Sequence, residues 1–317
     1  MPPTDPRPVL LALRALKLGD LLVAVPALTA LRRGFPEHRI VLATSGWLLP
    51  IVELIGSVDE LLPTPGLSRP IEFGGRDVDI AVNLHGRGPE SGSLLDALRP
   101  RRLIAHLPDD PDGPEWIDGM LERERWARLV RSAGVHADAE EVAISVPSTP
   151  PALAEAAVVH VGAFYGARQW PAERFADVAR TLARRGERVV FTGGAEDRER
   201  AQVVAALAGL ADESVMAGHL DLTGFAALVA AARLVITADT GAAHLASAYR
   251  TPSVVVFGPA PPEEWGPPEG GPHIVLTRAE LRRGDAFADE PDPALLAVSA
   301  GEVIEAIERL RVARSAD

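Results

Sequence analysis

The chain has 317 residues, which predicts two domains, and 47% of them are hydrophobic, enough for a core in each domain. Its formal net charge of −12 argues against a nucleic-acid-binding protein, and the absence of cysteine excludes disulfides, thiolate nucleophiles and zinc–thiolate sites. No apolar run is long enough to span a membrane, and residues 1–8 are too polar and proline-rich for a signal peptide, so we expect a cytoplasmic protein without a transmembrane segment.

Apolar strand-like runs alternate with amphipathic helical patterns along the first half of the chain, which predicts a parallel sheet covered on both faces. The expected strands are 9–13, 40–43, 60–62, 80–84 and 103–106, and the expected helices are 20–33, 48–55 and 123–133. Pro26 predicts a kink in the first of these helices. The charged run Glu122–Arg125 is expected to be a solvated helix face.

The second half repeats the alternation after a proline-rich segment, 145–151, which is expected to be an exposed linker. The expected strands are 158–161, 188–191, 234–237 and 253–257, and the expected helices are 171–184, 197–207, 225–232 and 300–312. Two Rossmann-like halves of α/β class follow from this pattern. Neither half has Gly-x-Gly-x-x-Gly after its first strand, which argues against a nicotinamide or flavin dehydrogenase.

The most informative segment is 238–244, Ala-Asp-Thr-Gly-Ala-Ala-His, because it joins a strand to an Ala-rich helix. The first amides of a helix lack intrahelical partners and lie at the positive end of its dipole, so they form an anion site. Asp239 and Thr240 are natural capping residues, Gly241 allows close approach of a ligand, and His244 falls on the first turn. An ordinary capped helix is the alternative interpretation.

Four motifs, taken in order, resemble those of glycosyltransferase family nine, the ADP-heptose heptosyltransferases and their relatives, over nearly the whole chain. They are Leu18-Gly19-Asp20-Leu21 with Pro26-Ala27-Leu28, the run from Arg168 to Phe175, the run from Phe191 to Glu196, and the run from Asp239 to Leu245 with Phe257-Gly258-Pro259. The resemblance implies a GT-B fold, in which two Rossmann-like domains face each other across a cleft. Residues 1–148 would bind the acceptor and residues 149–317 the nucleotide-sugar, with the last helix packing back on the N-terminal domain.

The resemblance also implies roles for individual residues. Asp20 matches the catalytic residue and would take the proton of the acceptor hydroxyl. The donor phosphates would be bound by Arg168, Asp239, Thr240, Gly241 and His244, the nucleotide by Gly193, Gly194 and Glu196, and the acceptor or sugar would contact Gly19, Asn83 and His85. Trp170 is expected to be a packing anchor. No cofactor and no metal ion are implied, so the reaction is expected to be an inverting, metal-independent sugar transfer from an ADP-linked donor.

The chain departs from the family at one position that matters for the donor. Thr223 or Gly224 stands where many members have an acidic residue for the ribose, and Asp221 is a candidate helix cap instead. No basic cluster suited to a phosphorylated acceptor is evident near the first-domain loops. The sugar, the nucleobase and the acceptor therefore stay open, as does peripheral contact with a membrane. The alternatives are a GT-B nucleotide-sugar epimerase or hydrolase, and a non-catalytic nucleotide-sugar-binding relative.

Overall fold

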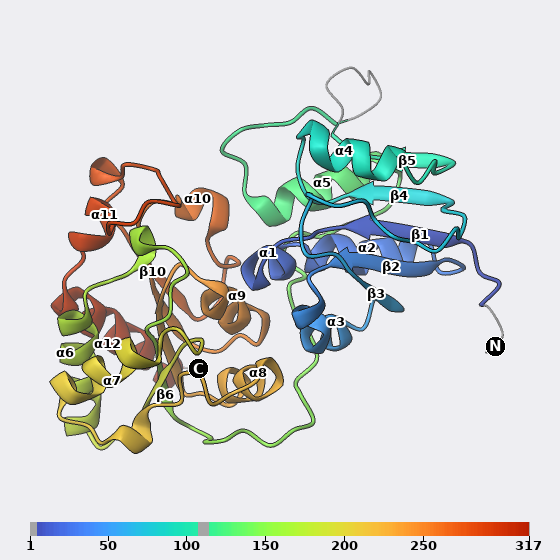
Figure 1. The fold of residues 1–317 in the computed structure, drawn as a ribbon. Helices are drawn as coiled ribbons and strands as arrows, with labels where there is room; N and C mark the ends of the chain where they lie inside the picture. Colours follow the sequence, from blue (N-terminus) through green and yellow to red (C-terminus); the bar gives the residue numbers. More distant parts are fainter. Residues whose placement is uncertain (1–4, 107–113, 317) are drawn as a thin grey trace. The chain divides into compact units, whose positions relative to one another are not determined.

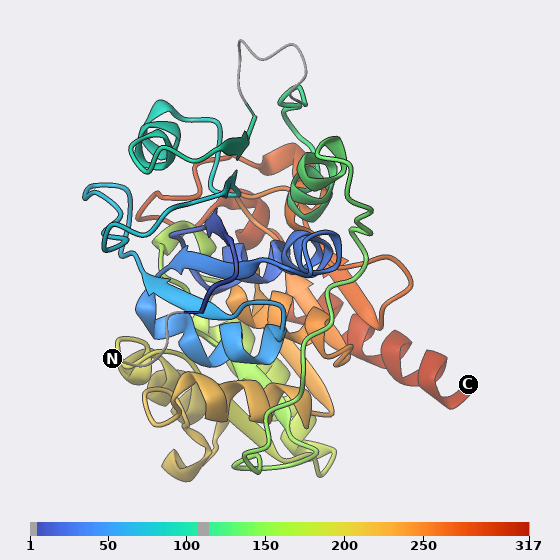
Figure 2. The same cartoon turned by 90° about the vertical axis from the view of Figure 1, so that its right-hand side faces the viewer.

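The computed structural model describes residues 5–106 and 114–316, so part of the 1–8 segment lies outside the described residues. The chain divides into two compact units, residues 1–145 and 146–317, each built around one parallel sheet. The predicted boundary between residues 148 and 149 falls three residues after this division. Each unit is α/β, as the alternating pattern predicts, and Figures 1 and 2 show helices packed around each sheet.

The first unit has five parallel strands in the order β3-β2-β1-β4-β5. Its elements are β1 Val9–Leu13, α1 Leu18–Val23, α2 Val25–Gly34, β2 Arg39–Thr44, η1 Gly46–Leu48, α3 Leu49–Ile55, β3 Glu60–Pro63, β4 Ile80–Asn83, α4 Pro89–Asp96, β5 Arg102–Ile104 and α5 Glu122–Ser132. Every second residue of β1 packs on one face of the sheet, where Val9, Leu11 and Leu13 join Leu95 of α4 in a buried cluster. The predicted helix 20–33 is divided at Ala24, because Pro26 lies in the first turn of α2.

The second unit also has five parallel strands, in the order β10-β9-β8-β6-β7. Its elements are β6 Ala157–His160, η2 Gly166–Arg168, α6 Ala172–Arg184, β7 Val189–Thr192, α7 Arg198–Ala208, η3 Asp212–Ser214, α8 Leu222–Ala230, β8 Leu234–Ala238, α9 Gly241–Ala248, β9 Ser253–Val256, α10 Pro262–Trp265, β10 His273–Leu276, η4 Ala279–Leu281, α11 Pro293–Leu296 and α12 Ala300–Ala316. The sequence patterns missed β10, α4 and the short helices α10 and α11.

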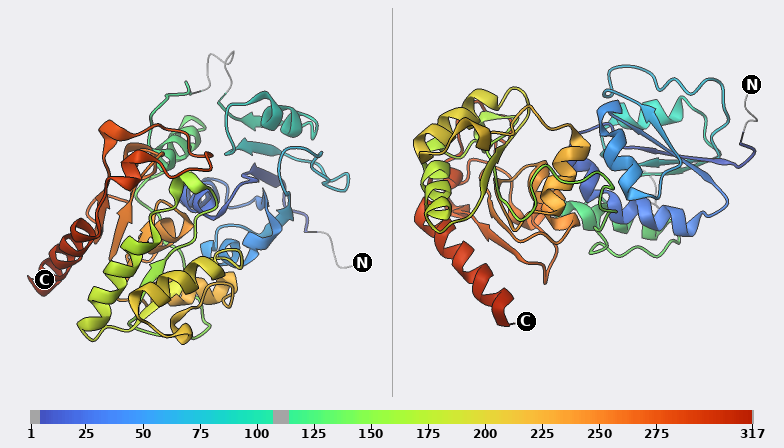
Figure 3. Two further views of the ribbon diagram at one scale, coloured as in Figure 1. Left: turned by 60° about the vertical axis from the view of Figure 1, so that its left-hand side comes forward. Right: turned by 90° about the horizontal axis from the view of Figure 1, so that it is seen from below.

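The last helix belongs to the core of its own unit. Val303, Ala306, Ile307 and Leu310 of α12 are buried in a cluster with residues of α6, β9 and β10. Figure 3 shows the end of this helix, in dark red, extending beyond the sheet. The expectation that the last helix also packs back on the N-terminal domain stays a prediction.

Candidate functional site

Strand order marks one place in each sheet where a ligand is expected. In the first unit, the chain adds β2 and β3 on one side of β1 and then β4 and β5 on the other, so the switch point lies between β1 and β4. In the second unit, it adds β7 on one side of β6 and then β8, β9 and β10 on the other, so the switch point lies between β6 and β8. Open α/β sheets bind ligands outside the carboxyl ends of the strands at such switch points. The segments that follow these four strands contain Asp20, His85, Arg168 and Asp239, so the predicted residues fall at the expected edge within each unit.

In the second unit, Thr240 rather than Asp239 caps α9. The Thr240 hydroxyl accepts a hydrogen bond from the amide of Ala242 at 3.3 Å, and it lies 3.0 Å from the hydroxyl of Thr237 at the end of β8. Gly241 is the first residue of the helix. The eight-residue helix therefore begins directly at the carboxyl edge of the sheet, with its positive dipole end at the switch point.

The buried carboxylate of Asp239 holds Arg168 beside this helix start. Arg168, at the end of η2, donates from Nη1 to Asp239 Oδ2 at 2.9 Å and to the Asp239 carbonyl at 3.2 Å. The side chain of Asp239 is 3% exposed and that of Arg168 is 25% exposed. Nε2 of His244 lies 3.9 Å from the other oxygen of the carboxylate. One carboxylate thus lies against two basic groups at the helix N-terminus.

Gly162, after β6, and Gly193, after β7, both pack closely against the side chain of Asp197. A Cβ on Gly193 would lie 2.6 Å from Asp197 Cβ, and one on Gly162 would lie 2.5 Å from Asp197 Oδ2. Asp197 accepts a hydrogen bond from the amide of Gly194 at 2.8 Å. Burial raises the pKa of Asp197, and the hydrogen bond from Gly194 opposes this effect. Sequence reasoning missed Asp197, although an Asp three residues after a Gly-Gly pair is a signal of a side chain closing a loop.

Glu196 is exposed and lines a cavity of about 380 Å³ together with Gln169, Asp197 and Arg200. Trp170, by contrast, is fully buried, as expected of a packing anchor, and its ring lies 4.8 Å from that of Phe175. Its Nε1 donates to the carbonyl of Val298 at 3.0 Å. Asp221 caps α8 by accepting a hydrogen bond from the amide of Gly224 at 2.7 Å, which confirms the predicted cap.

In the first unit, Asp20 lies in the first turn of α1, three positions after the N-cap residue Lys17. Its Oδ2 accepts a hydrogen bond from the amide of Lys17 at 3.3 Å, and its side chain is 26% exposed. Arg14, which follows β1, donates from Nε to the carbonyl of Asp20 at 2.9 Å and has Nη2 3.5 Å from Asp20 Oδ1. Arg14 contacts both the carbonyl and the carboxylate of Asp20, and the amide of Lys17 contacts the carboxylate, so the side chain of Asp20 is held in one orientation.

Arg14 is a functional-site candidate that sequence reasoning missed. Its side chain is 1% exposed, and it also donates to the carbonyl of Leu84 at 2.5 Å, after β4. Burial lowers the pKa of Arg14, while Asp20 and Glu122 raise it. Nη2 of Arg14 lies 3.9 Å from Glu122 Oε2, and its guanidinium lies 4.8 Å from the ring of Trp126. A charged residue directly after the first strand was the available signal.

The charged run Glu122–Arg125 is not a solvated face. Glu122, Arg123 and Arg125 are all buried, with 8%, 4% and 2% exposure. Glu122 accepts hydrogen bonds from Arg125 Nε at 2.7 Å and from Trp126 Nε1 at 3.1 Å. These charges are buried because each has a partner, which helical periodicity alone does not reveal.

Asn83 and His85 have different surroundings, although both follow from the end of β4. Asn83 is 3% exposed, and its amide donates to Ser91 Oγ at 3.0 Å while its Oδ1 accepts from the amide of His85 at 3.1 Å. Both functional groups of Asn83 thus fix the loop before α4. His85 is half-buried, and its Nδ1 is buried without a hydrogen-bond partner among the described residues. Burial, together with the nearby charge of Arg14, lowers the pKa of His85 to about 4, and Asp20 opposes the shift.

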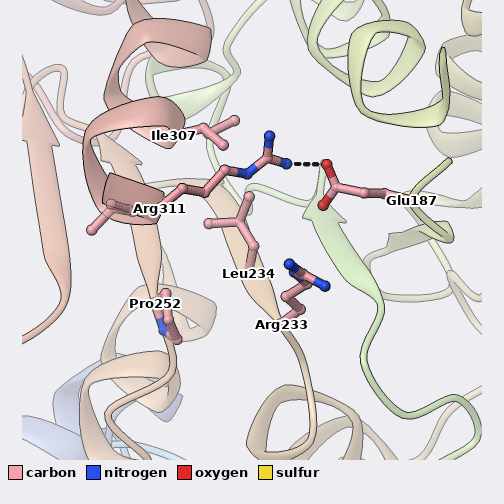
Figure 4. A pocket seen from close by; sticks show the side chains of 7 residues that line it. Glu187, Arg233, Leu234, Pro252, Ile307 and Arg311 are labelled. Atoms are coloured by element: carbon pink, nitrogen blue, oxygen red, sulfur yellow. Dashed lines mark hydrogen bonds and ion pairs between the residues drawn. The ribbon is translucent and has the colours of Figure 1, made fainter. Parts of the chain in front are cut away.

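A cavity of about 280 Å³ lies at the opposite edge of the second sheet (Figure 4). It is lined by Glu187, Arg233, Leu234, Pro252, Ile307, Leu310 and Arg311, and Arg311 forms an ion pair with Glu187. Leu234 begins β8 and Pro252 precedes β9, so this cavity lies at the amino ends of the strands, away from Asp239. Parallel sheets place ligand sites at the other end.

Residues 5–106 and 114–316 contain no group of three or more His, Asp or Glu side chains placed to hold a metal ion. Within the same ranges, none of the helices combines the length and apolarity needed to cross a membrane.

Comparison with known proteins agrees with the arrangement of both units. Residues 127–283 match the family model for glycosyltransferase family 9 (heptosyltransferase). The chain is 22% identical to lipopolysaccharide heptosyltransferase 2 of Escherichia coli K12, over 92% of this chain and 95% of that protein. The structure of a family 9 glycosyltransferase from Veillonella parvula superposes with a TM-score of 0.77 at 22% identity, covering 96% of this chain and 97% of that one.

The E. coli heptosyltransferase WaaC, solved with ADP-2-deoxy-2-fluoro heptose, superposes with a TM-score of 0.68 at 20% identity. The match covers 95% of this chain and 99% of that one. These likenesses show that both Rossmann-like units belong to the GT-B class of folds. Together with the family match and the relatives along the whole chain, they support a glycosyltransferase that is similar to the family 9 heptosyltransferases.

Proposed function

We propose that this enzyme transfers heptose, or a related sugar, from an ADP-linked donor to an acceptor hydroxyl with inversion at the anomeric carbon. The observation that carries the proposal is the pairing of Arg168 with Asp239 at the N-terminus of α9. The names of the relatives support heptose as the sugar, and the ligand in the WaaC structure supports ADP as the nucleotide.

The second unit would bind the donor through its diphosphate. The amides that open α9 at Thr240 and Gly241 are anion-binding groups, and Arg168 adds a full positive charge with a forked geometry. Nε of Arg168 is buried without a hydrogen-bond partner among the described residues, so the guanidinium keeps a donor beyond those used by Asp239. His244 would add another donor. Asp239 carries the same charge as a phosphate, so its role would be to orient Arg168 and His244.

The nucleoside would lie over the loop after β7. The proposal assigns Gly193, Gly194 and Glu196 to this part of the donor, with the exposed Glu196 reaching the ribose or base. Asp197 would hold the loop in shape through its hydrogen bond with the amide of Gly194. Asp221 caps α8 through Oδ1, and the proposal gives it this structural role and no contact with the ribose.

The first unit would bind the acceptor and supply the base. Asp20 would accept the proton of the acceptor hydroxyl as its oxygen bonds to the anomeric carbon, while the bond to the β-phosphate oxygen breaks and the electron pair leaves with ADP. A single displacement of this kind inverts the anomeric configuration. Arg14 would position Asp20, Gly19 and His85 are the residues assigned to the acceptor or sugar, and Asn83 would act only by shaping the His85 loop.

We propose that the reaction needs no metal ion and no cofactor. Negative charge grows on the departing diphosphate, and groups aimed at that charge in advance are the main source of stabilisation in such reactions. Arg168 and the start of α9 are groups of this kind, held in place before the donor binds.

Calorimetric titration with ADP, UDP, GDP and dTDP tests the donor half of the proposal, and ADP should bind most tightly. Asp20→Asn tests the acceptor half: turnover should fall roughly 10²- to 10⁴-fold while ADP affinity is unchanged, as expected for a general base. Asp96→Asn, an exposed carboxylate of the same unit, is the matched control. ADP release with an acceptor identified from a glycan panel gives the rate, and NMR of the product gives the anomeric configuration. Full activity of Asp20→Asn would contradict the assignment.

A further inference from the structure

Two exposed phenylalanine rings and a tyrosine form a continuous aromatic surface on the second unit. Phe164 and Phe287 are 71% and 70% exposed. The ring of Tyr165 lies between them, 5.0 Å from each ring by centroid, in edge-on contacts. We call Phe164, Tyr165 and Phe287 the aromatic surface. Exposed rings that are gathered in one place mark interaction sites more often than single exposed apolar residues do.

The aromatic surface is built from two loops that are fixed to each other. The amide of Ala167 donates to the carbonyl of Ala288 at 2.8 Å, and the amide of Asp292 donates to the carbonyl of Ala167 at 3.1 Å. A Cβ on Gly166 would lie 1.6 Å from the carbonyl oxygen of Asp289, so only glycine allows this approach. The rings are therefore presented on a pre-organised support, which lowers the entropic cost of binding.

The same loops place the aromatic surface next to the proposed phosphate site. Phe164 and Tyr165 precede η2, which ends at Arg168, and the amide of Arg168 donates to the carbonyl of Tyr165 at 3.1 Å. The second loop is attached near the end of β9, because Arg282 Nε donates to the carbonyl of Gly258 at 2.9 Å. Both loops lie at the carboxyl end of the sheet, near the labels α10 and α11 in Figure 1. A group attached to a phosphate held by Arg168 is thus within reach.

The charges around the rings indicate which part of a donor fits there. Asp285, Asp289 and Glu290 are exposed in the Phe287 loop and outweigh the exposed Arg283 near its start, so an anionic phosphate is disfavoured beside it. A neutral ring with hydroxyl groups suits this setting, since hydroxyls donate to carboxylates. Ring C–H groups also meet the negative faces of aromatic rings favourably. In a nucleotide-sugar, the group bonded directly to the terminal phosphate is the sugar.

We propose that the aromatic surface binds the sugar ring of the nucleotide-sugar donor and contributes to the choice of sugar. Phe164 and Phe287 stack on the C–H face of the ring, and the carboxylates of the Phe287 loop accept hydrogen bonds from its hydroxyls. This assignment rests on the proposed diphosphate site at Arg168 and α9.

Calorimetric titration with ADP and with ADP-heptose separates the sugar from the nucleotide. Phe164→Ala and Phe287→Ala should each weaken ADP-heptose binding by about 2- to 12-fold, in the range of a lost aromatic contact, and leave ADP binding unchanged. Phe287→Leu keeps apolar bulk without a ring and should show most of the same loss. Trp47→Ala removes a ring that is 56% exposed on the first unit and should change neither affinity. Both phenylalanines are exposed, so the variants should unfold at the wild-type temperature.

Other results of these titrations would overturn the proposal or one part of it. Equal losses for ADP and ADP-heptose would assign the rings to the nucleobase and overturn the proposal, and so would unchanged ADP-heptose binding. Wild-type affinity in Phe287→Leu would overturn the stacking component. A wild-type protein that binds neither ligand would refute the proposed donor site itself, whereas ADP binding with no effect of the ring variants would refute this inference alone.

Discussion

Replacing Arg168 by alanine should weaken ADP binding by roughly 1.5 to 3 kcal/mol, the range for a charged hydrogen bond, or about 10- to 150-fold in Kd. The structure adds a second consequence, because the carboxylate of Asp239 is 3% exposed and loses its hydrogen bond from Arg168, while the Asp239 carbonyl loses another. Removal of one partner from a buried pair costs about 3–5 kcal/mol, and the 25% exposure of Arg168 puts this case at the lower end. Arg168→Ala should therefore be both weaker in binding and less stable.

The double variant Arg168→Ala with Asp239→Asn separates these two effects. It removes the unpaired charge, so the free energy of unfolding in urea should return toward the wild-type value while ADP affinity stays low. Arg180→Ala removes the same charge from the same unit, at a half-exposed position of α6, and controls for the general effect of charge on anion binding. If calorimetry shows that the double variant regains ADP affinity, Arg168 serves only to neutralise Asp239 and the phosphate assignment is wrong.

Three further predictions concern the buried charges, the histidines and the metal. Glu122→Gln should lower the free energy of unfolding in urea by about 2–3 kcal/mol because it weakens buried contacts, whereas Glu124→Gln, 36% exposed, should cost less than about 0.5 kcal/mol; equal losses would contradict the burial argument. Burial lowers the pKa of His85 and of His160 to about 4, whereas a histidine in an unfolded chain has a pKa of about 6.5. Because the unfolded state then binds more protons, the free energy of unfolding should decline as the pH falls from about 6.5 to about 4. In urea titrations along that pH range, His160→Gln should reduce the decline and the exposed His136→Gln should not. Transfer should persist in EDTA, and a loss of activity that Mg²⁺ or Fe²⁺ restores would refute the metal-free proposal.

The alternation of strands and helices can be predicted from the sequence because it depends on local apolar periodicity. The strands over 9–13 and 234–237 and the start of α9 were predicted from this signal and from the capping chemistry of Thr240, and all are present. β10 escaped prediction because its four residues are only half-buried and read as a loop between prolines and glycines. The family resemblance rests on motifs of the same local kind, each at the end of a strand.

Only the tertiary structure decided which charged residues act together. Arg168 and Asp239 are 71 residues apart, and their pairing depends on β6 lying beside β8 in the sheet. The contacts of Arg14 with Leu84 and Glu122 likewise require β4 and α5 to be in place, and they turn a run predicted as solvated into a buried ion network. A helical pattern predicts burial from the type of each residue by itself, so it predicts that charged residues are exposed. Whether a charged residue is in fact buried depends on the partner that the tertiary structure places beside it. The sequence by itself therefore determined the elements and the residues at their ends, and the order of the strands determined which of those residues meet.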